Sequence, residues 1–365
     1  MSEFSTLYIA HKLARRGKQG KREVVLFEMR MCENIERLKY HLRAGTYKVG
    51  KYREFTIYDP KKRNIQALSY IDRIVQHSLC DNILGPYLDK RLIYDNAACR
   101  IGKGTHFAMD RLTKFMREYY KKYGSEGYIL KCDIRKYFDS IYHPVLKDKI
   151  SKMKLPEDIK ALLYMIVDSY ECTPERGLPM GNQTSQWFAL YYLDGLDRQV
   201  KEQLGVKYYT RYMDDIIILH PDKESIKKIL VAMTEYVEGE LKLEFNEKTQ
   251  IHHIRQGVQY LGFRFYLTEN GKVIRLLRAQ NKRKLRKRIT KFGKLISNDQ
   301  IDYTNLHNSL VSTRGHLLHG NTYNLRTRYF TELDNIIYTH DMEKADMQIA
   351  YLIETNNKPI QGGRA

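Results

Sequence analysis

The spacing of hydrophobic residues divides the first third of the chain into helical and extended segments. Apolar side chains recur at every third or fourth position on one predicted helix face, which comprises Ile35, Leu38 and Leu42. Gly45 follows where a helix C-cap glycine is expected. Residues 52–68 instead have the β-branched and aromatic residues of two strands around a basic turn. Residues 69–88 return to helical spacing, with Ser69 or Asp72 near the helix start.

The middle of the chain, from about Tyr128 to Leu267, alternates between strand and helix patterns. Apolar runs and alternation predict strands and hairpins over residues 128–134, 206–220 and 258–277. The last of these contains Asn270-Gly271, a dipeptide typical of a tight hairpin turn. Helical spacing is found in two further segments, residues 184–200 and 224–241. This mixture predicts the α+β fold class.

A strongly basic helix is predicted beyond Gly271. Residues 271–297 contain eleven Lys and Arg and no acidic residue. The apolar residues of this segment still form a helical stripe of Leu285, Ile289, Phe292 and Ile296. Such a helix packs on one side and is cationic on the other. A polyphosphate backbone is its natural partner, and a merely solvated basic face is the alternative.

Composition points in the same direction. Hydrophobic content is an ordinary 42%, but the formal net charge is +20, and a soluble protein this basic usually meets polyanions. The 29 Tyr residues suit base stacking, although sheets also use tyrosine. Five scattered cysteines without a C-x-x-C pair argue against a disulfide framework or a zinc site. No segment has the length of apolar residues that a membrane span needs, and no signal peptide is recognisable, so we expect a cytoplasmic protein.

Three carboxylates carry the candidate chemistry. Asp214 and Asp215 lie between two segments predicted as strands, and Asp133 ends another predicted buried strand. Such an arrangement offers hard oxygen ligands for two Mg²⁺ ions about 4 Å apart, the requirement of nucleotidyl transfer. The alternatives are an ordinary acidic turn and a helix-capping or strand-end Asp133.

Several motifs together resemble a known family. "CDIRKYFDSI", "GLPMGNQTSQ", "RYMDDIIIL", "LEFNEKTQI" and "YLGFRF" occur in the order and spacing of the reverse transcriptase palm. Upstream, "DPKKRNIQALSYIDRIVQHSL" and "ACRIGKGTHFAM" resemble the fingers motifs of the bacterial, group II intron-like branch. The resemblance, from about Tyr47 to Phe265, implies a right-hand polymerase with a small antiparallel palm sheet and a helical thumb. The implied division is fingers 1–127, palm 128–270 with 141–180 partly returning to the fingers, basic thumb 271–340 and C-terminal tail 341–365.

The resemblance also implies roles for the acidic residues and a lysine. Asp133, Asp214 and Asp215 would bind two Mg²⁺ ions, for which Mn²⁺ can substitute, with Asp215 sometimes only supporting the others. Lys248 matches the position that protonates pyrophosphate, and a general acid there is chemically reasonable. The alternative for Lys248 is a surface salt bridge.

Further residues match the family's nucleotide site. Arg63, with Lys61 or Lys62, would hold the triphosphate, because guanidinium donors suit phosphate oxygens. The same basic residues could simply decorate a hairpin turn, and Arg73 could equally be a structural arginine. Phe138 matches the steric gate, where a phenyl ring favours deoxynucleotides because it offers the ribose 2′-hydroxyl no hydrogen bond. The alternative for Phe138 is a core residue.

One motif indicates a subfamily. Most reverse transcriptases that resemble this chain read Gln-Gly, three residues, then Ser-Pro, whereas here Met180 replaces the Gln and Gln186 replaces the Pro after Ser185. This pattern resembles diversity-generating retroelements of bacteria and phages, whose enzymes misincorporate opposite template adenines before the cDNA replaces a variable gene segment. Met180 offers shape but no hydrogen bond, so nucleotide discrimination is expected to slacken. Gly181 is expected to allow close backbone approach to the nucleotide or template.

The family's nucleic-acid contacts can be carried over as well. Tyr260 and Gly262 would belong to the primer grip, although "YLGFRF" is equally a good buried strand. Four residues are expected to contact the template backbone: Arg100, Lys103, Thr105 and His106. On the basic helix, Arg283 and Lys287 are expected to contact the duplex.

The implied partners are template RNA, a primer or cDNA strand, dNTPs and a small basic accessory variability protein that oligomerises; no membrane is involved. Two other functions remain open. A retron-like or phage-defence reverse transcriptase would share the chemistry and make a different cDNA from a non-coding RNA. A non-catalytic RNA-binding protein with a relic palm is disfavoured by the intact set of Asp133, Asp214, Asp215 and Lys248.

Overall fold

The computed structural model describes residues 1–58, 62–300 and 302–356. The chain divides into two compact units, Met1–Ile254 and Arg255–Ala365, and each is described by itself. Lys61 and residues 357–365 of the predicted tail lie outside the described residues. The expected limits of fingers, palm, thumb and tail stay predictions.

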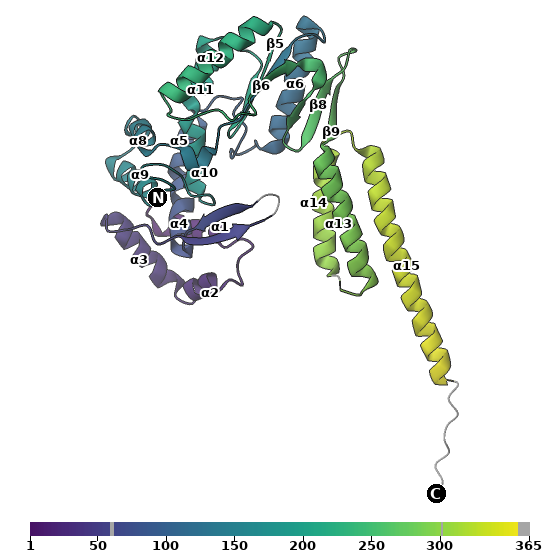
Figure 1. The fold of residues 1–365 in the computed structure, drawn as a ribbon. Helices are drawn as coiled ribbons and strands as arrows, with labels where there is room; N and C mark the ends of the chain where they lie inside the picture. The colour runs from purple at the N-terminus through teal and green to yellow at the C-terminus, as the bar shows by residue number, and fades with distance from the viewer. Residues whose placement is uncertain (59–61, 301, 357–365) are drawn as a thin grey trace. The chain divides into compact units, whose positions relative to one another are not determined.

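The N-terminal part of the first unit consists of helices beside one two-stranded hairpin (Figure 1). The predicted helix face and the predicted hairpin are both confirmed. Ile35 and Leu38 are buried, and Gly45 has a φ of +66° just beyond the helix. Its elements are α1 (Phe4–Ala14), α2 (Arg22–Glu28), α3 (Met31–Arg43), β1 (Arg53–Ile57), β2 (Arg63–Ala67), α4 (Tyr70–Leu79), η1 (Cys80–Leu84) and α5 (Gly85–Asp89).

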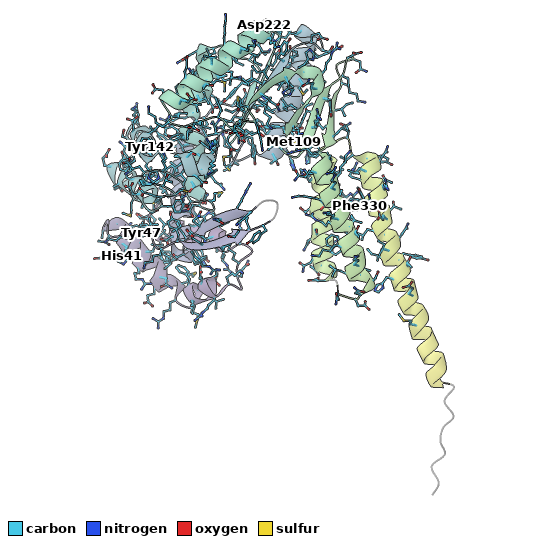
Figure 2. All side chains as sticks on the ribbon, in the orientation of Figure 1. His41, Tyr47, Met109, Tyr142, Asp222 and Phe330 are labelled. Atoms are coloured by element: carbon cyan, nitrogen blue, oxygen red, sulfur yellow. The ribbon has the colours of Figure 1, made fainter. Side chains whose placement is uncertain are left out.

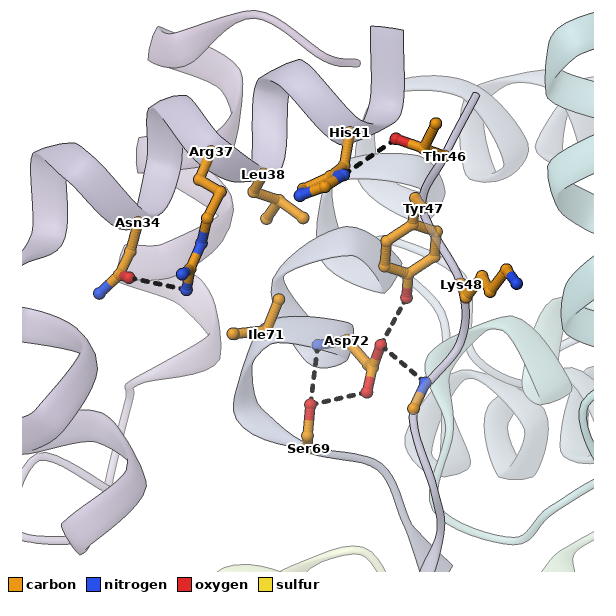
Figure 3. A pocket seen from close by; sticks show the side chains of 11 residues that line it. Asn34, Arg37, Leu38, His41, Thr46, Tyr47, Lys48, Ser69, Ile71 and Asp72 are labelled. Atoms are coloured by element: carbon orange, nitrogen blue, oxygen red, sulfur yellow. Dashed lines mark hydrogen bonds between the residues drawn. The ribbon is translucent and has the colours of Figure 1, made fainter. Parts of the chain in front are cut away.

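A buried carboxylate ties the start of α4 to the segment that precedes β1 (Figure 3). Asp72 accepts hydrogen bonds from the Tyr47 and Ser69 hydroxyls, both at 2.6 Å, and from the Gly50 amide at 3.3 Å. Burial raises the pKa of the Tyr47 hydroxyl, and Asp72 raises it further, so this hydroxyl stays a donor. Ser69 is the N-cap of α4, which confirms its expected place at the helix start.

A four-stranded antiparallel sheet forms the other part of the first unit (Figure 1). Its strand order is β4-β5-β3-β6, from β3 (Tyr128–Cys132), β4 (Tyr209–Tyr212), β5 (Asp215–His220) and β6 (Gln250–His253). The helices α6 (Thr105–Tyr123) and α12 (Lys223–Gly239) pack against it. Figure 2 labels Met109, buried on α6, and Asp222, which caps α12 by accepting from the Ser225 amide at 2.7 Å. The predicted α+β class is confirmed.

The helical conformation predicted over residues 184–200 is confirmed, but the helix is not continuous, because it is interrupted at Leu193. Two carbonyls that would accept its next helical hydrogen bonds are taken by other side chains. The Tyr137 hydroxyl donates to the Ala189 carbonyl at 2.5 Å, and the Arg211 guanidinium donates to the Leu190 carbonyl at 3.0 Å. The helices between β3 and β4 in the chain are α7 (Tyr137–Ser140), α8 (His143–Ser151), α9 (Glu157–Asp168), α10 (Gln183–Tyr192), α11 (Asp194–Arg198) and η2 (Gln199–Gln203).

The second unit begins with a three-stranded antiparallel sheet of β7 (Val258–Tyr260), β8 (Phe263–Leu267) and β9 (Val273–Leu277). The predicted turn at Asn270-Gly271 is confirmed, with Gly271 at φ +78°. A second turn, at Leu261-Gly262, was not predicted. Both of its residues have positive φ, +46° and +91°, as a two-residue hairpin loop with matching twist requires.

Three helices complete the second unit: α13 (Ala279–Ser297), α14 (Tyr303–Leu318) and α15 (Tyr323–Asn356). Leu285, Ile289 and Ile296 are buried on α13, which confirms the predicted stripe. α15 continues to Asn356, beyond residue 340 where the thumb was expected to end. Within the described ranges, we find no helix with the length and apolar character needed to cross a membrane.

Candidate active site

Adjacent strands bring two acidic residues to one end of the four-stranded sheet. Asp133 directly follows β3, and the pairing of Cys132 with Ile216 sets the end of β3 beside the start of β5. The pairing of Tyr212 with Asp215 closes the β4–β5 hairpin and leaves Met213 and Asp214 as its two-residue loop. Asp133 and Asp214 are close enough to share a side-chain hydrogen bond. The predicted convergence of these two residues is present in the structure.

The electrostatics of this pair are unfavourable for two negative charges. Burial raises the pKa of Asp214 to about 6, and the neighbouring Asp133 carboxylate contributes to the same upward shift. A cation placed against both carboxylates would relieve the repulsion, and carboxylate oxygens are the ligands that hard divalent cations prefer. The pair therefore fits a metal-binding role.

Asp215 has a different environment from its neighbour. Its carboxylate forms an ion pair with Lys131 on β3, at 3.2 Å between Nζ and Oδ1, and both side chains are about three-quarters buried. Sequence reasoning missed Lys131. Among the residues that the structure describes, no three His, Cys, Asp or Glu side chains form a ready-made metal cage. The geometry thus brings together Asp133 and Asp214 and gives Asp215 a lysine partner.

The segment that carries Lys248 is fastened to Asp133 through Asn246. The Asn246 amide donates to the Asp133 carbonyl at 2.7 Å, and its side-chain Nδ2 donates to Asp133 Oδ2 at 3.4 Å. The Lys248 amide in turn donates to Asn246 Oδ1 at 3.1 Å, while the Lys248 side chain is exposed. Asn246 was not predicted; its only signal is its place two residues before Lys248.

The loop with Met180 and Gly181 lies against β2. The Gln66 amide donates to the Met180 carbonyl at 3.3 Å. Gly181 has φ +118°, and a Cβ there would meet the Ile65 Cγ2 at 3.3 Å. The close backbone approach expected at Gly181 is therefore made to the protein's own strand. Whether it also approaches a nucleotide stays a prediction.

The loop is held from two other sides as well. The Leu178 amide, two residues before Met180, donates to the carbonyl of Phe138, the predicted steric gate, at 2.8 Å. The Phe138 ring is half-buried. The Gln183 amide donates to the buried side chain of Gln76 at 3.0 Å. Gln76 was not predicted. Gln186, on α10, is exposed.

The basic residues predicted to bind the triphosphate differ in solvent exposure and in their contacts with the protein. Lys62 and Arg63 are exposed at the start of β2. Arg73 is partly buried, and its Nε donates to the Leu68 carbonyl at 3.1 Å. This hydrogen bond to Leu68 is the kind of contact expected of a structural arginine, which was the alternative for Arg73.

Two of the residues predicted to contact the template form hydrogen bonds within the protein itself. The Arg100 side chain is only 6% exposed; it pairs with Asp89 at 2.5 Å and donates to the Ile93 carbonyl at 2.7 Å. Lys103 donates to the Tyr94 carbonyl at 2.6 Å, and burial lowers its pKa to about 8. The other two, Thr105 and His106, are exposed in the first turn of α6.

In the second unit, the predicted primer-grip residues lie at the β7–β8 turn. Tyr260 is buried, and the Gly262 carbonyl accepts from Asn281 Nδ2 of α13 at 3.1 Å. Arg283 and Lys287 are exposed on α13. The β7–β8 turn is therefore fixed to the start of the basic helix.

Comparison with known proteins places the chain in a family. A model described as reverse transcriptase (RNA-dependent DNA polymerase) matches residues 53–265, more than half of the chain. None of the curated proteins matches the sequence. Among solved structures, telomerase from Candida albicans in complex with a fragment of telomeric RNA is similar, with TM-score 0.49 and 11% identity, over 82% of this chain and 61% of that one. Truncated apo telomerase from Candida tropicalis gives 0.47 and 15%, over 62% and 54%.

The chain thus spans 61% and 54% of the lengths of these two structures. The family model begins at the first strand of the β1–β2 hairpin, continues through the sheet with Asp133 and Asp214 and ends within β8. The chain belongs to the reverse transcriptase (RNA-dependent DNA polymerase) family.

Proposed function

We propose that the protein is an RNA-directed DNA polymerase that extends a primer on a template RNA by two-metal nucleotidyl transfer. In this reaction the primer 3′-hydroxyl oxygen forms a bond to the α-phosphorus of a dNTP while the bond to pyrophosphate breaks. The observation that carries the proposal is the convergence of Asp133 and Asp214 at the ends of paired strands, within the segment that the family model matches.

Asp133 and Asp214 would hold the divalent cations, with Asp215 in a supporting role through Lys131. When bound, such cations activate the attacking hydroxyl and neutralise the leaving pyrophosphate. Asn246 orients Asp133 by hydrogen bonds to its carbonyl and its carboxylate. We assign proton delivery to pyrophosphate to Lys248, whose exposed side chain lies two residues along the same segment.

On the nucleotide side, we assign triphosphate binding to Lys62 and Arg63, whose exposed cationic groups suit phosphate oxygens. Phe138 would exclude the ribose 2′-hydroxyl. Its link to the Met180 loop, through the Leu178 amide, supports a shared site for sugar and base.

Within the family, we propose the error-prone branch that diversifies a gene by copying a template RNA. Met180 and Gln186, in place of the more usual Gln and Pro, support this assignment. Because the Gln66 amide donates to the Met180 carbonyl of this loop, we attribute the effect of the difference at position 180 to side-chain chemistry. A basic oligomeric accessory protein is the expected partner of this branch.

The test is primer extension on an adenine-containing RNA template with Mg²⁺ and dNTPs, followed by sequencing of the cDNA. Wild type is run beside Asp214→Asn and Met180→Gln. We expect cDNA with errors concentrated opposite adenine, no product from Asp214→Asn and fewer errors from Met180→Gln. Accurate cDNA from the wild type would support the polymerase assignment and favour the retron-like or phage-defence alternative over the error-prone branch. If Asp214→Asn extends primers at the rate of the wild type, the two-metal assignment is wrong.

A further inference from the structure

The first unit contains a completely buried ion pair whose arginine is hydrogen-bonded to the loop of the candidate metal site. Arg211 lies on β4 and Asp197 on α11, and both side chains have no solvent exposure. The Arg211 Nε and Nη2 donate to the two Asp197 oxygens at 2.7 and 2.5 Å. The Tyr209 hydroxyl also donates to Asp197. A buried pair with this many hydrogen bonds costs desolvation energy and is weak evidence for stability alone, so its other contacts matter.

The same guanidinium reaches the loop that carries Asp214. Arg211 Nη1 donates to the Met213 carbonyl at 2.9 Å. The backbone of Met213 has a φ of +55°, a conformation that residues other than glycine rarely adopt. Such a conformation persists only where surrounding contacts determine it. The Arg211 hydrogen bond is one such contact, made at the residue immediately before Asp214.

A third contact joins this loop to the helix that follows Met180. Arg211 Nη2 donates to the Leu190 carbonyl of α10 at 3.0 Å, which helps to end α10 before α11 begins. α10 starts at Gln183, directly after the loop that contains Met180. One rigid cation thus contacts the metal-site loop, the end of α10 and the Asp197 carboxylate on α11.

We propose that Arg211, held by Asp197, is a positioning residue that keeps the Met213-Asp214 loop in the conformation in which Asp214 faces Asp133. The proposal deepens the proposed function and rests on it for the polymerase readout. The planar fork of arginine suits this role, because Arg211 donates to both oxygens of a carboxylate and to two carbonyls at once, whereas a lysine ammonium has only three donors on one atom. A buried pair that only stabilises the core would not affect cation binding.

The test compares Mn²⁺ binding by the full chain, measured by electron paramagnetic resonance, with primer extension. The main variant is Arg211→Met combined with Asp197→Leu, which removes both charges and leaves no buried unpaired ion. A second variant, Arg211→Lys, keeps a cation and loses the fork. Loss of a charge-assisted hydrogen bond at the loop is expected to weaken Mn²⁺ binding about tenfold or more. Primer extension is expected to lose kcat with little change in the KM for dNTP.

Tyr209→Phe is the matched control. It removes one hydrogen bond from the same buried carboxylate and leaves the contact between Arg211 and Met213 in place. We expect it to lower the unfolding temperature and keep wild-type Mn²⁺ affinity. If both Arg211 variants bind Mn²⁺ like wild type, or if Tyr209→Phe weakens binding as much as they do, the positioning role is refuted. Wild type that binds Mn²⁺ but extends no primer would instead count against the proposed function, while the Mn²⁺ comparison would still decide the role of Arg211.

Discussion

Replacing Asp214 with asparagine is expected to stabilise the metal-free protein while abolishing its activity. Burial beside Asp133 raises the pKa of Asp214 from 3.8 to about 6. Each pKa unit corresponds to ~1.4 kcal/mol, so ionising Asp214 costs the folded protein up to ~3 kcal/mol relative to the unfolded chain. Asp214 keeps some contact with solvent. The expected gain in the free energy of unfolding at pH 7 is therefore about 1–3 kcal/mol.

The pH dependence has a definite sign. Between about pH 4 and pH 6 the folded state binds more protons at Asp214 than the unfolded state does, so the stability of the wild type falls as the pH rises through this range. The asparagine side chain of the variant cannot titrate. The difference in unfolding temperature between variant and wild type should thus be small near pH 4 and reach its full size above about pH 6.

The assay is thermal unfolding with a chelator present, from pH 4 to pH 8, repeated in excess Mg²⁺. Bound metal stabilises only a folded state that binds it, so saturating Mg²⁺ should reduce or reverse the advantage of the variant. Asp215→Asn is the control: Asp215 is paired with Lys131, so its loss should give no gain in stability. An Asp214→Asn protein that is less stable than wild type at pH 7 without metal, or a difference that does not vary with pH, would refute the reasoning.

Three other substitutions follow from the site. Gly181→Ala places a Cβ at φ +118° and 3.3 Å from Ile65, so we expect a loss of about 1–2 kcal/mol in urea unfolding; a gain would show that this backbone is not constrained. Asn246→Ala removes the side-chain contact with Asp133 and should lower kcat/KM in primer extension about tenfold, with a smaller effect on the unfolding temperature. Phe138→Ala should raise ribonucleotide incorporation relative to deoxynucleotides; an unchanged ratio in single-nucleotide extension would assign this ring to the core alone.

The patterns that were predicted correctly are those set by local sequence. Strand periodicity places Asp133 directly after one strand and Asp214 in the turn between two others, and the antiparallel pairing of β3 with β5 brings the two residues together. The turn at Asn270-Gly271 was predicted because its residue types favour positive φ, whereas Leu261 adopts positive φ without such a signal.

The contacts that were missed depend on which groups the fold brings next to a charged side chain. The family resemblance predicts template contacts for Arg100 and Lys103, and these contacts stay predictions; what the sequence did not reveal is that both side chains also bond groups within the fold. Both are used by carbonyls of their own loop region, and Arg100 also by Asp89. Arg211 was read only as part of a strand, since its partner Asp197 lies on another element. Burial of a charge is a tertiary property, and periodicity alone does not reveal it.

The arrangement around Met180 separates the position of the loop from the chemistry of one side chain. The Met180 carbonyl accepts a hydrogen bond from the Gln66 amide, and a Cβ at position 181 would meet Ile65 Cγ2 at 3.3 Å. The backbone of the loop thus lies close to β2, through a hydrogen bond that does not involve the Met180 side chain. With Met180 in the proposed nucleotide site, a substitution at position 180 should then change the side chain that faces the nucleotide without moving the loop. A change in fidelity on Met180→Gln, with kcat/KM for correct nucleotides preserved, would reflect the hydrogen-bonding capacity of that side chain. A general loss of rate at unchanged fidelity would instead mean that the side chain supports the loop after all.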